Sequence, residues 1–248
     1  YTDFVKEFGA KGLAYIRVEG EDSSSLSSPI LKYLSEECLK NILKNLDVKK
    51  GDLIFFGAGK EKIVNDYMSR LIARLGNDLA LTQEGYAACW VTDFPMFEEA
   101  SDGSLTSLHH PFTSPVESNV EELDKLKPLD INSKAYDMVI NGTEIGGGSI
   151  RIHRKDMQEK VFDLLGLSHE EAQQKFGFFL KTLTSGCPPH GGIAFGLDRL
   201  AMLMVGAESI RDVIAFPKTQ SAVCLLTEAP SSVRDESLEE LHISRKED

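Results

Sequence analysis

The sequence has few cysteines and no long apolar run, and each shortage excludes a class of protein. Its 4 cysteines in 248 residues show neither CxxC spacing nor close pairing, so we expect neither a zinc site nor a disulfide framework. No apolar stretch approaches the roughly 18 to 20 residues that cross a bilayer. These features predict a protein of a reducing compartment, the cytoplasm.

Positive charge is scarce as well. The chain carries 27 Lys and Arg against 39 Asp and Glu, a net charge of −12, which argues against a protein that coats nucleic acid by bulk charge. Hydrophobic residues make up 42%, too many for a disordered chain, so we expect one large folded domain or two smaller ones. Because Tyr1 already lies within an amphipathic pattern of Phe4, Val5 and Phe8, we expect the natural start upstream.

The first 85 or so residues show a strand–helix–strand–helix pattern. Residues 12–18 and 53–56 are apolar enough for strands. An apolar stripe at 38, 39, 42, 43 and 46 predicts a helix between them, and a second stripe over 63–75 predicts a helix that Gly76 ends. We expect these elements to form a compact α/β unit.

The remainder reads as antiparallel strands with helices between them. Strands are expected over 87–97 and in a hairpin of 135–140 and 143–153, where Asn141-Gly142 suits a type I′ turn. An acidic helix is expected near 120–125, and a capping box at Ser168 and Glu171 predicts a helix to about 183. Strand 191–195 should turn at Gly196 into helix 197–205. We expect the core to hold the aromatic side chains of Trp90, Phe176, Phe178 and Phe179.

The hairpin places two carboxylates on one surface. A two-residue turn pairs Val139 with Glu144 and puts Asp137 diagonally across on the same face. Two such acids repel each other unless a cation lies between them, and Mg²⁺ takes one or two carboxylates together with substrate phosphates. The alternative is a solvated sheet face, which the spacing alone leaves open.

Three consecutive glycines, Gly146 to Gly148, interrupt the second hairpin strand. Glycine within a strand marks a bulge or a close backbone approach. Strict alternation would put Arg151 on the face opposite Glu144, but one bulge within the triple glycine would bring Arg151 to the carboxylate face, where it could grip a substrate carboxylate. A surface ion pair of Arg151 is the open alternative.

Two further segments could carry chemistry. Asp198 and Arg199 stand in the first turn of the helix after Gly196, where free backbone N–H groups favour anions; an ordinary helix start is the alternative. His109 and His110, in a loop before a proline, could bind an acidic ligand when protonated or shape a pocket when neutral.

Five stretches carry a family resemblance. GGIAFGLDRLAMLMVG from Gly191 resembles motif 3 of class II aminoacyl-tRNA synthetases. Together with HHPFTSP from His109, AYDMVINGTEIGGGSIRIH from Ala135, PPHGG from Pro188 and SIRDVIAFPKTQSA from Ser209, it resembles the bacterial-type aspartyl-tRNA synthetases over nearly the whole chain.

The resemblance implies an α+β fold in three parts. Residues 1–81 would be part of a GAD insertion domain of α/β type, residues 82–241 the C-terminal part of the antiparallel class II catalytic core, and residues 242–248 a polar tail. The family's anticodon-binding domain, motif 1 and motif 2 have no counterpart in the chain, so we expect a fragment of a longer, homodimeric enzyme that is inactive alone.

The family pattern also implies roles for nine residues. Arg151 matches the arginine that holds the aspartate side chain, and His109 and His110 match the loop that closes on it. Asp137 and Glu144 match the acids that hold Mg²⁺ on ATP. The residues that lie along ATP in the family match Glu144, Gly196, Leu197, Asp198 and Arg199, of which Arg199 would act in catalysis.

The implied activity is aspartate-tRNA ligation. L-Aspartate and ATP would give aspartyl-adenylate, and the aspartyl group would pass to tRNA(Asp), with tRNA(Asn) as a second possible acceptor. The alternative is a naturally short, non-catalytic relative that binds ATP, aspartate or a partner protein.

Overall fold

The computed structural model describes residues 1–20 and 22–246, so the last two residues of the expected polar tail lie outside it. The chain divides into two compact units, residues 1–85 and 86–248. Both units combine helices with antiparallel sheets, which confirms the α+β class. Within the described residues, no helix combines the length and the apolar character needed to span a bilayer.

The first unit is built on a three-stranded antiparallel sheet of order β2-β1-β3. Its strands are β1 (Ala14–Val18), β2 (Leu26–Ser27) and β3 (Leu53–Phe56), and its helices are α1 (Thr2–Lys6), η1 (Ser23–Ser25), η2 (Leu31–Tyr33), α2 (Glu36–Leu46) and α3 (Glu61–Asp78). One buried cluster, containing Ile16 and Leu39, lies around β1 and α2, and a second, containing Val5 and Tyr67, joins α1 to α3.

Helix α3 continues past Gly76, where the sequence predicted its end. Glycine within a helix costs about 1 kcal/mol relative to alanine, which the packing of the buried Tyr67 and Leu71 side chains offsets. Helix α3 ends at Asp78. Two residues later, Ala80 adopts a φ of 52°, in the left-handed region.

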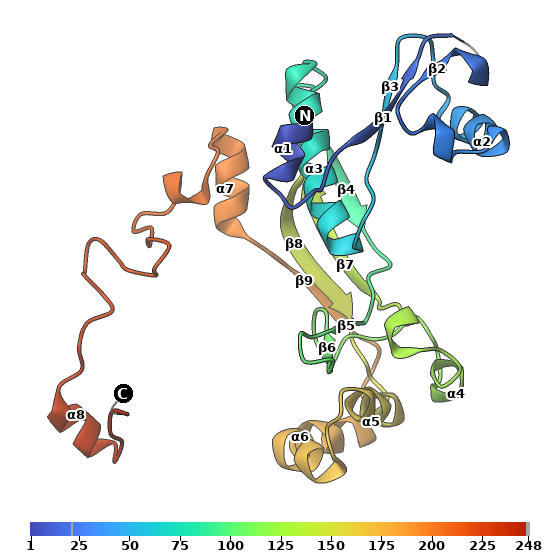
Figure 1. Ribbon diagram of the computed structural model, residues 1–248. Coiled ribbons are helices and arrows are strands. Elements are labelled where there is room, and N and C mark those ends of the chain that lie inside the picture. Colours follow the sequence, from blue (N-terminus) through green and yellow to red (C-terminus); the bar gives the residue numbers. More distant parts are fainter. Residues whose placement is uncertain (21, 247–248) are drawn as a thin grey trace. The chain divides into compact units, whose positions relative to one another are not determined.

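The second unit contains a four-stranded antiparallel sheet of order β4-β7-β8-β9 (Figure 1). These strands are β4 (Ala88–Val91), β7 (Ala135–Ile140), β8 (Thr143–Ile150) and β9 (Gly191–Phe195). A separate pair is formed by β5 (Phe97–Glu99) and β6 (Leu105–Ser107), and the helices are α4 (Val120–Leu123), η3 (Pro128–Asp130), α5 (Lys155–Leu164), α6 (His169–Thr184), α7 (Leu197–Val205), η4 (Ile210–Asp212) and α8 (Asp235–Glu240).

Local signals in the sequence predicted several of these elements to the residue. The bounds of β9 and α7 are those expected, and Gly206 ends α7 in the left-handed region. Asn141 and Gly142 have φ values of 50° and 77°, as a type I′ turn requires. The capping box of α6 is present, with Ser168 and Glu171 bonded to each other's backbone N–H groups. The second hairpin strand ends at Ile150, three residues earlier than expected.

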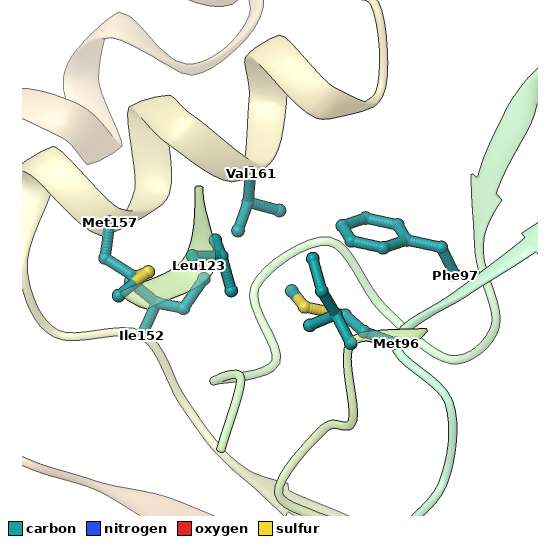
Figure 2. Packing of buried hydrophobic residues seen from close by; sticks show 7 residues of the cluster. Met96, Phe97, Leu123, Ile152, Met157 and Val161 are labelled. Atoms are coloured by element: carbon teal, nitrogen blue, oxygen red, sulfur yellow. The ribbon is translucent and has the colours of Figure 1, made fainter. Parts of the chain in front are cut away.

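A core under α5 joins helices to loops in the second unit (Figure 2). Met157 and Val161 of α5 meet Ile152, which follows β8, and Leu123 of α4. Met96, Phe97 and Ile131 complete the cluster, each at most 3% exposed. This core holds the chain that leaves β8 in place.

The expected burial of the aromatic side chains is only half right. Phe176 stacks on Phe162 at a ring distance of 5.0 Å, and Phe179 packs into the same cluster. Phe178 is 88% exposed, because it lies about 100° around the helix from Phe179 and about 200° from Phe176. Trp90 is 58% exposed, because both faces of the edge strand β4 are left uncovered by the described residues.

Candidate functional site

A bulge in the central hairpin decides which side chains share a face. Val139 pairs with Glu144, as the two-residue turn predicts, but Met138 pairs with Gly146. Ile145 is therefore an extra residue in β8. The expected bulge is present, but it lies at Ile145, directly before the triple glycine rather than within it. On the partner strand, the shift in register falls between Met138 and Val139.

The bulge brings Arg151 to the face that carries the two carboxylates. Beyond it, Asp137 pairs with Gly147, and alternation then puts Ser149 and Arg151 on the same side. Asp137, Glu144 and Arg151 line one pocket. The consequence predicted from the sequence is thus found, with the irregularity shifted by one residue.

The histidine loop reaches this pocket through a short antiparallel contact. Thr113 forms a β-bridge with Arg151, and the N–H of Ser114 bonds to the carbonyl of Ile150 at 2.8 Å. His109 packs edge-on against Phe94 at 4.6 Å between ring centroids. His109 and His110 line the same pocket as the two carboxylates and Arg151.

The assembled pocket has a volume of about 300 Å³. Its lining combines two histidines, two acids, one arginine, two hydroxyls and two glycines: His109, His110, Thr113, Asp137, Glu144, Gly147, Gly148, Ser149 and Arg151. Five of the nine residues expected at the site thus lie together. A cavity of this size with opposite charges suits a small polar ligand.

Arg151 has a guanidinium nitrogen that is buried and unpaired. Among the described residues, Nη1 finds no hydrogen-bond partner and is shielded from solvent. A buried charged donor without an acceptor is costly. A planar guanidinium satisfies this need best by binding a carboxylate with two parallel hydrogen bonds. The pocket therefore favours a ligand that carries a carboxylate.

The surroundings of His110 favour its neutral form. Burial lowers its pKa, and the positive charge of Arg151 lowers it further. The N–H of Phe112 lies 3.2 Å from Nδ1, so this nitrogen accepts and Nε2 carries the proton. His110 can thus donate a hydrogen bond to an acidic ligand.

The carboxylates of Asp137 and Glu144 lie close enough to influence each other. Burial raises the pKa of Asp137, and the charge of Glu144 raises it further, against a smaller opposing effect of His109. Glu144 has an ion-pair partner in Arg199, but among the described residues Asp137 has none, so the repulsion between the two acids is only partly compensated. Two carboxylates match the protein ligands that Mg²⁺ takes when phosphates supply others.

Because Gly147 has no side chain, the carboxylates of Asp137 and Glu144 can occupy the space beside it. A Cβ at this position would lie 2.7 Å from Oδ1 of Asp137 and 3.8 Å from Oε1 of Glu144. No third His, Cys, Asp or Glu joins them in a metal-holding cluster anywhere in the described chain. The residues thus fit a divalent cation that a substrate also ligates, and they do not form a closed protein cage.

The start of α7 lies beside the acidic end of this pocket. The N–H of Gly196 bonds to the carbonyl of Ile145 at 2.8 Å, and Nη1 of Arg199 lies 3.5 Å from Oε1 of Glu144. Leu197 is 78% exposed, and Asp198 is exposed in the first turn. These four residues do not line the pocket described above, but Arg199 joins them to it through Glu144.

Two site residues were missed from the sequence. Thr113 and Ser149 are 2% and 4% exposed, and their hydroxyl oxygens lie 3.3 Å apart. Ser149 has a signal that could have found it, because it lies two residues from Arg151 on the same strand face. Thr113 has no comparable signal, since its partner lies 36 residues away.

The chain matches the family of tRNA synthetases class II (D, K and N) over residues 10–220. It is similar to an Entamoeba histolytica asparaginyl-tRNA synthetase solved with asparaginyl-adenylate, with 22% identity, a TM-score of 0.38, and coverage of 57% of this chain and 26% of that one. It is also similar to the aspartyl tRNA synthetase of Entamoeba histolytica, with 20% identity, a TM-score of 0.41, and coverage of 73% and 30%.

A third similar structure is the asparaginyl-tRNA synthetase of Pyrococcus horikoshii, with 17% identity, a TM-score of 0.41, and coverage of 73% of this chain and 34% of that one. The chain thus spans between 26% and 34% of the length of these three proteins. The family match itself extends over most of the chain. The protein therefore belongs to the class II tRNA synthetases of the D, K and N group.

Proposed function

We propose that this chain is part of an aspartate-tRNA ligase of the bacterial type. The enzyme would activate L-aspartate with ATP and transfer the aspartyl group to tRNA(Asp), with tRNA(Asn) as a second possible acceptor. One observation carries the choice of amino acid, namely the buried, unpaired Nη1 of Arg151 in the pocket beside His110. Its natural partner is the side-chain carboxylate of aspartate.

The positive charge of Arg151 discriminates among aspartate, lysine and asparagine, the amino acids denoted by D, K and N in the family description. A lysine side chain would bring a second cation toward the guanidinium, which repels it. Asparagine offers one carbonyl oxygen and an NH₂ group that Arg151 cannot bind, since the guanidinium has donors and no acceptor. Aspartate offers two charged acceptors, so it is the preferred substrate.

The proposed reaction takes place between aspartate, held near Arg151, and ATP, held near Arg199. An oxygen of the aspartate α-carboxylate attacks the α-phosphorus of ATP, a new P–O bond forms, and pyrophosphate leaves with the electrons of the broken bond. Arg199 at the start of α7 would offset phosphate charge. Asp137 and Glu144 would hold Mg²⁺, which when bound with ATP supplies further charge neutralisation.

The other parts of the proposal rest on the family resemblance. We assign residues 1–81 to part of a GAD domain, and we expect the complete protein to be a cytoplasmic homodimer. Leu197 and Asp198 would lie along the nucleotide together with Gly196. The 248-residue chain alone is expected to be inactive, because the family's motif 2 has no counterpart in it.

ATP–pyrophosphate exchange by the complete natural protein tests this function. We expect exchange with aspartate and little with asparagine or lysine. Arg151→Leu should raise the KM for aspartate by about a hundredfold or more, the scale of losing a charge-assisted pair, and should leave the KM for ATP unchanged. Arg154→Leu is the matched control, because that guanidinium pairs with Asp156 outside the pocket.

Three results would contradict the proposal or its parts. An Arg151→Leu enzyme with an unchanged KM for aspartate would remove the assigned role of that residue. A preference for asparagine or lysine would overturn the choice of substrate. Binding of ATP and aspartate without any exchange would favour the non-catalytic relative instead.

A further inference from the structure

A buried glutamine bonds to the loop that carries the two histidines. Gln158 lies on α5 and is 0% exposed. Its Nε2 donates a hydrogen bond of 2.9 Å to the carbonyl oxygen of Pro111. Pro111 follows His109 and His110 directly in the chain, so the bond holds the backbone next to both rings.

The chain on either side of this point is held by other means. The N–H of Leu108 bonds to the carbonyl of Met96 at 3.1 Å, and the N–H of Ile152 bonds to the carbonyl of Phe112 at 2.9 Å. The ring of Phe112 also packs among other aromatic rings, with Phe179 4.9 Å away. The Gln158 amide thus holds the chain at Pro111, between Leu108 and Phe112, which other bonds fix in place.

Stability alone does not account for a glutamine at this position. Its neighbours on the buried face of α5 are the apolar Met157, Val161 and Phe162. Within the described part of the chain, Oε1 of Gln158 has no hydrogen-bond partner, and a buried unpaired acceptor costs free energy. A methionine would fill a similar volume without that cost. The amide must therefore serve its remaining contact, the bond to Pro111.

We propose that Gln158 is a positioning residue for the histidine loop. It acts through the Pro111 carbonyl on the placement of His109 and His110 at the amino-acid end of the pocket. The inference rests on the proposed aspartate-activating function. It goes beyond that function by assigning a role to a side chain that touches neither substrate and lies on a helix outside the sheet.

The test compares Gln158→Met with Gln174→Met in the complete protein. Gln174 lies on α6 and is exposed, so the control makes the same chemical change away from the loop. For Gln158→Met we expect the KM for aspartate to rise about tenfold, since small misplacements of binding groups have effects of this order or larger. The KM for ATP should not change, and the melting temperature should change little, because losing the bond to Pro111 offsets removal of the unpaired Oε1.

Amide hydrogen exchange gives a second readout that does not depend on activity. In Gln158→Met we expect faster exchange at residues 109, 110, 112 and 113, with unchanged exchange in β7 and β8. If the wild-type enzyme does not use aspartate at all, the proposed function fails, while the exchange data still decide whether Gln158 holds the loop.

Two outcomes would overturn the inference. One is unchanged exchange in the loop together with an unchanged KM for aspartate. The other is a lower melting temperature, or failure to fold, with equal losses for aspartate and ATP, which would make Gln158 a structural residue of the α5 core.

Discussion

The guanidinium of Arg199 lies against two groups of Glu144. Its Nη1 donates a 2.6 Å hydrogen bond to the Glu144 backbone carbonyl and lies 3.5 Å from the Glu144 carboxylate. The side chains are 46% and 52% exposed, and an ion pair this exposed contributes at most about 1 kcal/mol to stability. The contact therefore orients the side chains of Arg199 and Glu144 and contributes little to the stability of the fold.

Replacing Arg199 should separate activity from stability. Arg199→Gln is expected to lower the rate of aspartate-dependent ATP–pyrophosphate exchange by about a hundredfold or more, while the free energy of unfolding changes by less than about 1 kcal/mol. Denaturant unfolding and exchange kinetics measure the two effects. Arg234→Gln, at an exposed position before α8, is the control. A loss of stability that matches the loss of rate would contradict this prediction.

Two neighbouring glycines should respond differently to the same substitution. A Cβ at Gly148 would lie 2.0 Å from the carbonyl oxygen of Gly192, and a strand backbone cannot retreat. Gly148→Ala should therefore cost more than about 2 kcal/mol of stability. At Gly147 the obstacle is the end of the Asp137 side chain, which can rotate. Gly147→Ala should fold and lose exchange activity, because the carboxylate is displaced.

Thermal unfolding and exchange kinetics of both variants test this contrast. Gly177→Ala in α6 is the control, and it should raise stability by about 0.5–1 kcal/mol as alanine replaces glycine within a helix. A Gly147→Ala protein with full activity would show that the space beside Asp137 is not needed.

The raised pKa of Asp137 predicts how its replacement depends on pH. Its ordinary value is 3.8, and a higher value in the fold means that the native state binds this proton more tightly than the unfolded chain. Stability therefore falls as pH rises from about 3.8 through the folded pKa. Without ATP or Mg²⁺, Asp137→Asn should raise the melting temperature at pH 7, and the gain should shrink toward pH 4.

Asp156 provides a contrast of opposite sign. Its bond to Arg154 lowers its pKa, so Asp156→Asn should lower stability slightly at pH 7. Melting curves of both variants across this pH range check the prediction. A gain for Asp137→Asn that does not vary with pH would show that ionisation of this carboxyl is not its cause.

The lowered pKa of His110 should follow the charge of Arg151. Burial is the larger cause and Arg151 the next, so Arg151→Leu should raise the pKa without restoring its ordinary value of 6.5. Because the folded pKa is depressed, the stability that neutral His110 contributes is present above pH 6.5 and is lost as pH falls through the folded value. NMR titration of the ring protons measures the shift. Arg154→Leu should leave it unchanged.

Much of the hairpin was predictable because its signals are local. Asn141-Gly142 accepts positive φ at both positions, and the pairing of Val139 with Glu144 follows directly from a two-residue turn. The bulge was predictable in its effect but not in its exact residue. Its position depends on how β8 is held by β7 on one side and β9 on the other.

The exposure of Trp90 was not predictable from its residue type. A lone tryptophan in an apolar segment usually lies in a core, but here it stands on an edge strand and packs edge-on against Tyr136. Strand order is a property of the assembled sheet, and the apolar pattern of one segment does not contain it.

The sequence by itself determined the elements that carry the site: the hairpin with its two acids, the strand and helix that present Arg199, and the family to which the motifs belong. These depend on turn chemistry, glycine placement and periodicity over a few residues. Only the tertiary structure decided that Thr113 pairs with Arg151 and that Gln158 holds Pro111. These contacts join residues 38 and 47 positions apart, and they arise from packing, because the cores on either side must close before such groups can meet.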